Sequence, residues 1–314
     1  MPMCNIFYEM CGFCVESPEI LRYNVINITV HEELVTDTLF RLSLKERTWT
    51  MLELRPDYPY LYETHLHTSE SSRCGQSTGA DMADACKAAG YTGIFVTDHH
   101  WGGNTRADRS LPWEEWVDQY CAGYYAAKKR GDEIGLDVFF GWESGFLGTE
   151  FLIYGLSPEW MKQHPELRTN MPFGNAPKIE DPLTPEKQYP LIHEAGGMVI
   201  HAHPYREEPY IPEIRLFPDY VDGVETVNAT HSNPMSRGHN NPAFNDRAWA
   251  YAKEHNFPVT AGSDIHITNL FGGGMAFKHR LESPQDYIQA VLNREDYILT
   301  DGVHWFDQQG NILE

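Results

Sequence analysis

The stretch YETHLHTSES, residues 62–71, places two histidines one residue apart, where an apolar run gives way to a polar one. In a β-strand the side chains of residues i and i+2 point to the same face, so His65 and His67 would leave the end of a strand side by side. Two such imidazoles can hold one metal ion. Because the chain has 15 histidines, the pair can also be a coincidence. The surrounding sequence has to decide between these two interpretations.

The sequence around this stretch alternates between two patterns. Short apolar segments predict β-strands, and longer amphipathic segments between them predict helices. The predicted strands are residues 60–68, 91–100, 136–144, 149–156, 197–204, 221–229 and 257–266. The predicted helices are residues 79–90, 113–130, 185–197 and 245–255. This alternation predicts an α/β fold with a mainly parallel sheet, and about seven such units favour a closed (β/α)7 barrel.

The domain organisation follows from the residue at which the alternation of predicted strands and helices begins. Residues 1–55 show weak periodicity and are expected to form an N-terminal extension, whereas residues 56–314 form the barrel domain. Cys4, Cys11 and Cys14 cluster in the extension, and their role stays open. The cysteines of the barrel domain stand singly and are expected to be reduced thiols that are buried or half-buried. They are Cys74, Cys86 and Cys121.

Side chains that bind metals gather at the ends of five predicted strands. In a parallel barrel the carboxyl ends of all strands open on one face, where barrel enzymes keep their active sites. Histidine and carboxylate are ligands suited to Zn, Mn or Fe. The strand-end residues are His65, His67, Asp98, His99, Glu143, His201, His203, Asp264 and His266. All of these residues stand at the carboxyl ends of predicted strands. His65 and His67 are therefore interpreted as ligands of one metal ion.

The net charge limits the partners that we expect. The chain carries 24 Lys and Arg against 45 Asp and Glu, a formal charge of −21. A field of this sign repels nucleic-acid polymers and anionic membranes, so both are unlikely partners. No apolar run is long enough to span a bilayer, and no signal peptide is evident. We expect a cytoplasmic protein whose oligomeric state the sequence leaves open.

At this point the residues resemble the PHP (polymerase and histidinol phosphatase) domain family. HLHT (65–68) is similar to its first motif and TDHH (97–100) to its second. GWES around Glu143, AHP (202–204) and GSDIH (262–266) resemble the later motifs, in the expected order across about residues 58–300. The resemblance implies a distorted seven-stranded β/α barrel. It also implies two or three divalent metal ions (Zn, Mn or Fe) that support the hydrolysis of phosphate esters.

The resemblance also implies roles for individual residues. His65, His67, Glu143 and Asp264 would hold one metal ion. Glu143 would bridge to a second ion that His203 also binds, and His99 and His266 would hold a third. Metal-bound hydroxide would attack the substrate, with Asp264 and Glu143 as catalytic residues. Asp98 would orient a ligand histidine, and His100 and His201 would support the ligands.

The third metal site departs from the family pattern. Ser72 or Arg73 stands near a position that often carries a ligand, and Glu70 is a possible substitute. Glu150 replaces a histidine that members often have in the fourth strand. An enzyme with two tightly bound metals is therefore compatible with the sequence.

The substrate is less well defined than the metal ligands. Arg206 is the candidate phosphate-binding residue, with a surface ion pair to a neighbouring glutamate as the alternative. The segment FGGGMAF (271–277) is interpreted as flexible backbone near the site. We predict a phosphoesterase acting on a small phosphomonoester or nucleotide-type phosphate. A metal-dependent amide or C–N hydrolase and a non-catalytic metal-binding regulatory module are the alternatives.

Overall fold

A computed structural model describes residues 53–170, 178–236, 238–269 and 272–314. All of these residues belong to one compact unit, residues 51–314. Most of the predicted extension, with Cys4, Cys11 and Cys14, lies outside the described residues. The predicted boundary between residues 55 and 56 therefore stays a prediction.

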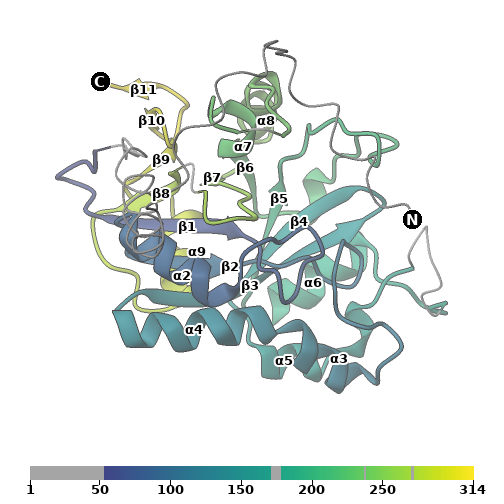
Figure 1. Ribbon diagram of the computed structural model, residues 1–314. Helices are drawn as coiled ribbons and strands as arrows, with labels where there is room; N and C mark the ends of the chain where they lie inside the picture. The colour runs from purple at the N-terminus through teal and green to yellow at the C-terminus, as the bar shows by residue number, and fades with distance from the viewer. Residues whose placement is uncertain (1–52, 171–177, 237, 270–271) are drawn as a thin grey trace, which may run out of the picture. The chain divides into compact units, whose positions relative to one another are not determined.

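Strands and helices alternate along most of this unit (Figure 1). The strands are β1 (Tyr60–Leu66), β2 (Gly93–Val96), β3 (Asp137–Phe146), β4 (Thr149–Tyr154), β5 (Met198–Ala202), β6 (Gly223–Asn228), β7 (Val259–Gly262), β8 (Gly273–Phe277), β9 (Tyr297–Asp301), β10 (Trp305–Phe306) and β11 (Ile312–Leu313). The helices are α2 (Gly79–Ala88), α3 (Trp113–Tyr120), α4 (Ala122–Ile134), α5 (Pro158–Lys162), α6 (Pro185–Glu194), α7 (Ala229–Ser232), α8 (Ala243–His255) and α9 (Pro284–Leu292), with 3₁₀ turns at Pro165–Leu167 and Pro218–Tyr220.

The strands form one sheet in the order β11-β10-β9-β8-β1-β2-β3-β4-β5-β6-β7. The pairs β1–β2, β2–β3, β5–β6 and β6–β7 are parallel, and the remaining pairs are antiparallel. The α/β class is confirmed, but a regular seven-fold β/α repeat is not what this sheet shows. The strand order nevertheless aligns β1, β2, β3, β5, β6 and β7 in one direction.

The first irregularity is a β-hairpin between β3 and β4. Only Leu147 and Gly148 separate these strands, and both residues have positive φ angles, 52° and 89°. Positive φ at both central residues defines the tight turn whose twist matches an antiparallel strand pair. A turn of two residues leaves no room for the helix that a parallel connection needs. The alternation of apolar and amphipathic segments in the sequence did not predict that β4 runs antiparallel to β3.

The second irregularity is the C-terminal part of the sheet. The prediction that residues 271–277 are flexible backbone is wrong for Gly273–Phe277, which form β8 beside β1. Gly274 has a φ of 139°, and a Cβ there would lie 2.3 Å from the carbonyl oxygen of Tyr62. Glycine is therefore needed for the close approach of two backbones in a buried strand rather than for mobility.

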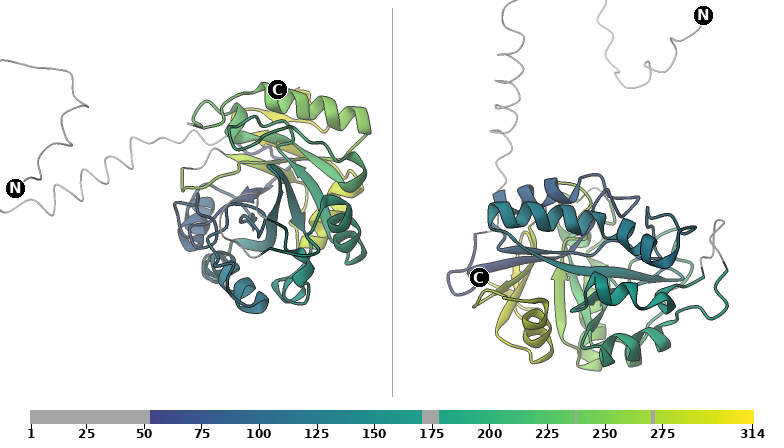
Figure 2. Two further views of the ribbon diagram at one scale, coloured as in Figure 1. Left: turned by 90° about the vertical axis from the view of Figure 1, so that its right-hand side faces the viewer. Right: turned by 90° about the horizontal axis from the view of Figure 1, so that it is seen from below.

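The sheet curls until the segment after β7 approaches β1. The amide of His67 donates to the Ile265 carbonyl at 2.9 Å, and the amide of Ile265 donates to the His65 carbonyl at 3.2 Å. The end of β1 and the end of β7 are thereby joined, although they are far apart in the sheet order. Helices lie around the outside of this curled sheet in both views of Figure 2.

Helices α2 and α4 pack side by side below β1 (Figure 1) and support the loop that follows it. The amide of Gly123 in α4 donates to Ser71 Oγ at 3.2 Å. A Cβ at Gly123 would lie 1.9 Å from Thr68 Oγ1, so this helix touches the loop directly.

We expect the substitution Gly123→Ala to destabilise the protein by about 1–3 kcal/mol, because the added methyl group overpacks a buried contact. Urea unfolding monitored by circular dichroism measures this loss. Gly238→Ala is the matched control, because a Cβ there meets no atom within 4 Å. Equal stability of the two variants would contradict the tight contact at Gly123.

Among the helices of the described residues, none combines the length and the apolar character that crossing a membrane requires. The cytoplasmic location stays a prediction.

Candidate metal centre

The end of β1 carries His65 and His67, and both side chains are buried. Their ring centroids lie 5.1 Å apart. His65 Nε2 lies 3.3 Å from Glu143 Oε1 and 3.4 Å from Asp264 Oδ1. His67 Nε2 lies 3.1 Å from Asp264 Oδ1 and 3.6 Å from Glu143 Oε2. The spacing of one residue brings both imidazoles to the same two carboxylates.

Glu143, in the second half of β3, lies at the centre of the group. One carboxylate oxygen, Oε2, is 2.6 Å from His99 Nδ1, and the other, Oε1, is 3.2 Å from His203 Nε2. Burial alone would raise the pKa of Glu143, but His99 and His65 hold it well below its usual range. Glu143 therefore stays anionic, and its two oxygens face imidazoles from three strand ends.

Asp264 follows β7, and its carboxylate reaches the same group of histidines. It adopts a φ of 53°, and His203 after β5 adopts a φ of 26°. Backbone strain of this kind in non-glycine residues is concentrated at functional sites. Burial alone would raise the pKa of Asp264, but Arg206 and His65 hold it well below its usual range.

Arg206 lies within the site rather than on the surface. It is 5% exposed, and its Nη2 donates to Asp264 Oδ2 at 2.5 Å. Its Nε donates to Nε2 of His231 at 3.0 Å. The alternative interpretation, a surface ion pair with an adjacent glutamate, is wrong because the guanidinium is buried against Asp264.

The reversal of β4 explains how Glu150 joins the group. Because β4 runs against its neighbours, its first residues lie at the edge where the other strands end. Glu150 Oε1 lies 3.5 Å from His99 Nδ1, and its Oε2 lies 3.6 Å from His203 Nε2. The carboxylate thus occupies a position from which it can replace the histidine of the family pattern.

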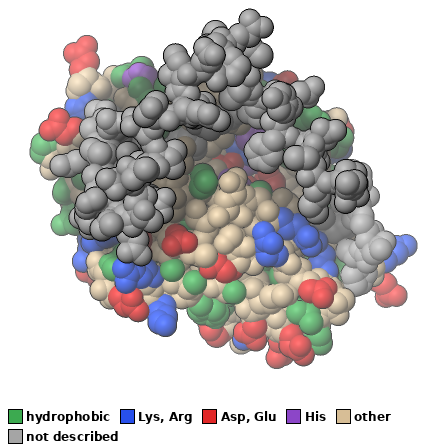
Figure 3. Space-filling model, in the orientation of Figure 1, with side chains coloured by type: hydrophobic (Ala, Val, Ile, Leu, Met, Phe, Trp, Pro, Cys, Tyr) green, Lys and Arg blue, Asp and Glu red, His purple; other side chains and the backbone are tan. Residues whose placement is uncertain are grey.

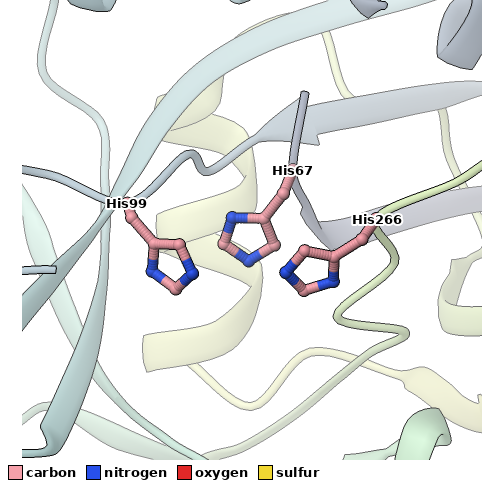
Figure 4. A group of neighbouring side chains, drawn as sticks. All are labelled: His67, His99 and His266. Atoms are coloured by element: carbon pink, nitrogen blue, oxygen red, sulfur yellow. The ribbon is translucent and has the colours of Figure 1, made fainter. Parts of the chain in front are cut away.

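His67, His99 and His266 form a second gathering next to the first (Figure 4). The ring of His67 lies between the others, with centroids 4.4 Å from His99 and 4.3 Å from His266. His266 Nδ1 lies 2.9 Å from the Asp264 carbonyl oxygen, to which it can only donate. The other nitrogen of His266 therefore keeps its lone pair.

The residues present fit a cluster of divalent metal ions. His65 Nε2, His67 Nε2, His99 Nδ1 and Glu143 Oε2 are buried without a hydrogen-bond partner in the described part of the chain. These atoms lie close to one another, yet their directions do not suit hydrogen bonds. Buried polar atoms without partners require an explanation, and converging lone pairs are what a cation needs. Four overlapping groups of three ligands share these residues.

Glu225 contacts two candidate ligand histidines, although no pattern in the sequence pointed to it. It is buried in β6, and its Oε1 lies 2.8 Å from His65 Nδ1. Its Oε2 accepts a hydrogen bond from the His203 amide at 3.1 Å. A carboxylate behind a ligand histidine fixes the ring orientation and leaves Nε2 free for a metal. The predicted strand 221–229 ends in no histidine, so only the folded structure reveals this role.

We expect Glu225→Gln to weaken metal binding about 10- to 100-fold, because the imidazole of His65 loses its charged hydrogen-bond partner. Competition with a chromogenic chelator measures the affinity. Glu254→Gln on the exposed side of α8 is the control. An unchanged affinity in the Glu225 variant would show that the orientation of His65 does not depend on this carboxylate.

Asp98 belongs to none of the candidate ligand groups of the described residues and contacts the loop after β1 instead. Its carboxylate accepts hydrogen bonds from the Thr68 amide and hydroxyl, both at 2.7 Å, and from Ser72 Oγ at 2.6 Å. Ser72 Oγ in turn lies 3.3 Å from His67 Nδ1 and accepts from the His99 amide at 3.0 Å. Asp98 thus reaches the ligand histidines through Ser72.

Three other candidates lie away from the cluster. Glu70 accepts a hydrogen bond from the Gly79 amide at 3.1 Å and so covers the start of α2. His100 packs against Trp116 and Tyr120, with centroids 5.0 and 5.4 Å away. His201 stacks on Phe151 at 5.3 Å. Both histidines are buried in aromatic surroundings and contact no carboxylate of the cluster.

Comparisons with known proteins place this fold among known ones. A family model described as PHP-associated matches residues 242–295. The fold is similar to that of a two-domain protein from Bacteroides vulgatus that contains a predicted PHP-like metal-dependent phosphoesterase. The identity is 14%, the TM-score is 0.55, and the match covers 81% of this chain and 69% of the other. The resemblance to the PHP family is confirmed. The curled α/β sheet is thus a PHP-like fold, and no curated protein matches the chain in sequence.

Two further solved structures are similar to this PHP-like chain at lower scores. An amidohydrolase from Chromobacterium violaceum has 16% identity and a TM-score of 0.40, with 65% of this chain and 87% of that chain covered. Endonuclease Q in complex with a 27-mer duplex substrate has 13% identity and a TM-score of 0.49, with 76% and 57% covered.

The expectation that a nucleic-acid polymer is an unlikely partner is contradicted. Endonuclease Q holds a duplex substrate with an abasic lesion at its active site. The expectation rested on the net charge of −21, which is a sum over the whole chain. Figure 3 shows Lys and Arg side chains between the acidic ones on the visible face, so this sum does not describe every part of the surface.

Proposed function

We propose that this chain is a metal-dependent hydrolase of phosphate esters. The observation that carries the proposal is the convergence of imidazole and carboxylate groups from the ends of β1, β2, β3, β5 and β7 on one buried point. Several of their atoms lack hydrogen-bond partners among the described residues. The overlap of the ligand groups supports two or three ions in close proximity rather than one isolated ion.

The ligands divide into neighbouring sets. His65, His67, Glu143 and Asp264 would hold one ion, and Glu143 with His203 would hold a second. Glu150, next to His99 and His203, is available to the same region. Bound divalent ions would supply Lewis acidity and make a water-derived nucleophile available at neutral pH.

The chain's own residues position the reacting groups. Glu143 presents both carboxylate oxygens to the cluster and can therefore lie between two ligand sets. Asp264 is held in place by Arg206, so its carboxylate can orient the attacking group or accept its proton. Arg206 uses two of its five N–H donors for Asp264 and His231, and the others are available to a phosphate oxygen.

A cavity next to the cluster supports a small reacting group. Its walls include Glu150, His203, Arg206 and Ile211. The guanidinium of Arg206 on this wall can donate hydrogen bonds to phosphate oxygens. We propose that the cavity receives the phosphate-bearing end of a phosphomonoester or of a nucleotide-type substrate.

The test is the release of inorganic phosphate by the metal-loaded protein. The substrates are p-nitrophenyl phosphate, sugar phosphates, mononucleotides and an oligonucleotide with a terminal phosphate, with small amides measured in parallel. We expect phosphate release by the wild type and its loss in the double variant His65→Ala/His67→Ala. Hydrolysis of amides alone would favour the C–N hydrolase, and a fully loaded but inactive protein would favour a regulatory module.

A further inference from the structure

His231, in the short helix α7, accepts a hydrogen bond from one neighbour and donates to another. Its Nε2 accepts from Arg206 Nε at 3.0 Å, and its Nδ1 lies 2.9 Å from Asn245 Oδ1. The side chain is buried. Because a guanidinium can only donate, Nε2 must carry the lone pair and Nδ1 the proton. The two contacts therefore select one neutral tautomer of His231.

The orientation of the Asn245 amide agrees with this tautomer. Its Nδ2 donates to the Asn228 carbonyl at 3.1 Å, and its Oδ1 accepts from the Asn228 amide at 3.2 Å. These two bonds to one backbone residue distinguish the amide oxygen from the nitrogen, so the oxygen faces His231 Nδ1. Asn245 lies in α8 and Asn228 ends β6, and both elements lie beside α7 (Figure 1). His231 is thus held by a strand and a helix of the scaffold.

The Arg206 guanidinium is held at two of its three nitrogens. His231 accepts from Nε, and Asp264 Oδ2 accepts from Nη2. The third nitrogen, Nη1, has no acceptor within the described part of the chain. A planar guanidinium held at two nitrogens has a fixed plane, so Nη1 keeps one direction. Since Arg206 lines the cavity next to the metal ligands, Nη1 is the nitrogen that is left for a ligand.

The contact with Asp264 alone would not fix this orientation. A single hydrogen bond to one carboxylate oxygen leaves the guanidinium free to turn about it. The Asp264 carboxylate also faces His65 and His67, and bound cations would share its charge. His231 has no such competing partner, because Arg206 and Asn245 occupy both of its ring nitrogens.

We propose that His231 is a positioning residue that orients the Arg206 guanidinium toward the phosphate group of the substrate. This inference rests on the proposed function and deepens it. His231 belongs neither to the cavity wall nor to any candidate ligand group of the described residues, so it acts through Arg206. A neutral acceptor suits this role, because it orients the guanidinium without cancelling the positive charge that attracts a phosphate.

Two substitutions separate the contact with Arg206 from the contact with Asn245. Glutamine can place its amide oxygen near the position of Nε2, so His231→Gln keeps an acceptor for Arg206. Asparagine can place its amide nitrogen near the position of Nδ1, so His231→Asn keeps only the donor to Asn245. The binding of inorganic phosphate to the metal-loaded, full-length protein is measured by isothermal titration calorimetry. The kcat and KM for p-nitrophenyl phosphate and the metal content are measured on the same preparations.

We expect His231→Asn to weaken phosphate binding and to raise KM by about 10- to 100-fold, because a hydrogen bond to a charged group is lost. The metal content should not change, and kcat should change much less than KM, since Arg206 holds the phosphate in the bound substrate as well. His231→Gln should bind phosphate nearly as the wild type does. In a protein that already carries Arg206→Met, His231→Asn should cause no further loss.

A role of His231 in folding alone predicts a different order of the variants. His231→Asn would then resemble the wild type, or both variants would bind phosphate equally well, and either result would overturn the proposal. A further loss in the Arg206→Met background would also overturn it, because His231 would then act without Arg206. A wild type that binds no phosphate and hydrolyses no ester would instead overturn the proposed function, and with it the role of Arg206.

Discussion

We expect Glu143→Gln to lower kcat/KM for phosphate-ester hydrolysis by roughly 10³-fold or more, with a parallel loss of bound metal. Glu143 is the carboxylate that faces His65, His99 and His203 at once, so no single neighbour can replace it. The amide of glutamine has nearly the same shape but carries no charge. It would also direct N–H donors toward atoms that must offer lone pairs.

Metal content and steady-state kinetics should be measured on the same preparation. Glu133→Gln is the control, because this glutamate lies in α4, is largely exposed and pairs with Arg130. It should keep both metal and activity. A Glu143→Gln variant with full activity would show that this carboxylate is not needed for the reaction.

The second large effect is expected for Arg206→Met in the metal-free protein. The guanidinium and the Asp264 carboxylate are both buried, so removal of the cation takes away the strongest cationic partner of a buried charge. Loss of one partner of a buried ion pair costs about 3–5 kcal/mol in the free energy of unfolding. Bound cations would neutralise Asp264 as well, so the loss should be smaller in the metal-loaded protein.

Urea unfolding of both forms measures this difference. Arg280→Met is the matched control, because Arg280 also forms two hydrogen bonds to an aspartate, Asp137, at 2.8 and 2.7 Å. Arg280 is 54% exposed, and exposed pairs contribute about 0–1 kcal/mol. Equal losses for the Arg206 variant with and without metal would show that the cations do not neutralise Asp264.

The sequence predicted those parts of the site that follow from local periodicity. His65 and His67 at the end of a strand, and the later strand ends with His99, His203 and Asp264, all lie at one edge of the sheet. The prediction that these residues lie together is correct because strands that run in one direction present their carboxyl ends at the same edge. The family resemblance supplied the division into ligand sets.

Other parts required the folded chain. Glu225 lies in the middle of its strand, and its contact with His65 depends on the curling of the sheet. Gln76 lies next to His266, whose carbonyl accepts from its amide at 2.7 Å, through a loop whose course no periodicity describes. Glu150 was named as a candidate, but the reversal of β4 that brings it to the cluster depends on a turn of two residues. Strand β8 was missed because its glycines resemble a loop in sequence.

The central claim is that the residues around Glu143 hold divalent metal ions. The most direct test is elemental analysis of protein purified without chelator, beside the double variant His65→Ala/His67→Ala. We predict two or three equivalents of Zn, Mn or Fe per chain in the wild type and a substantial loss in the variant. A wild type that is nearly free of metal and takes up none when it is added would contradict the account.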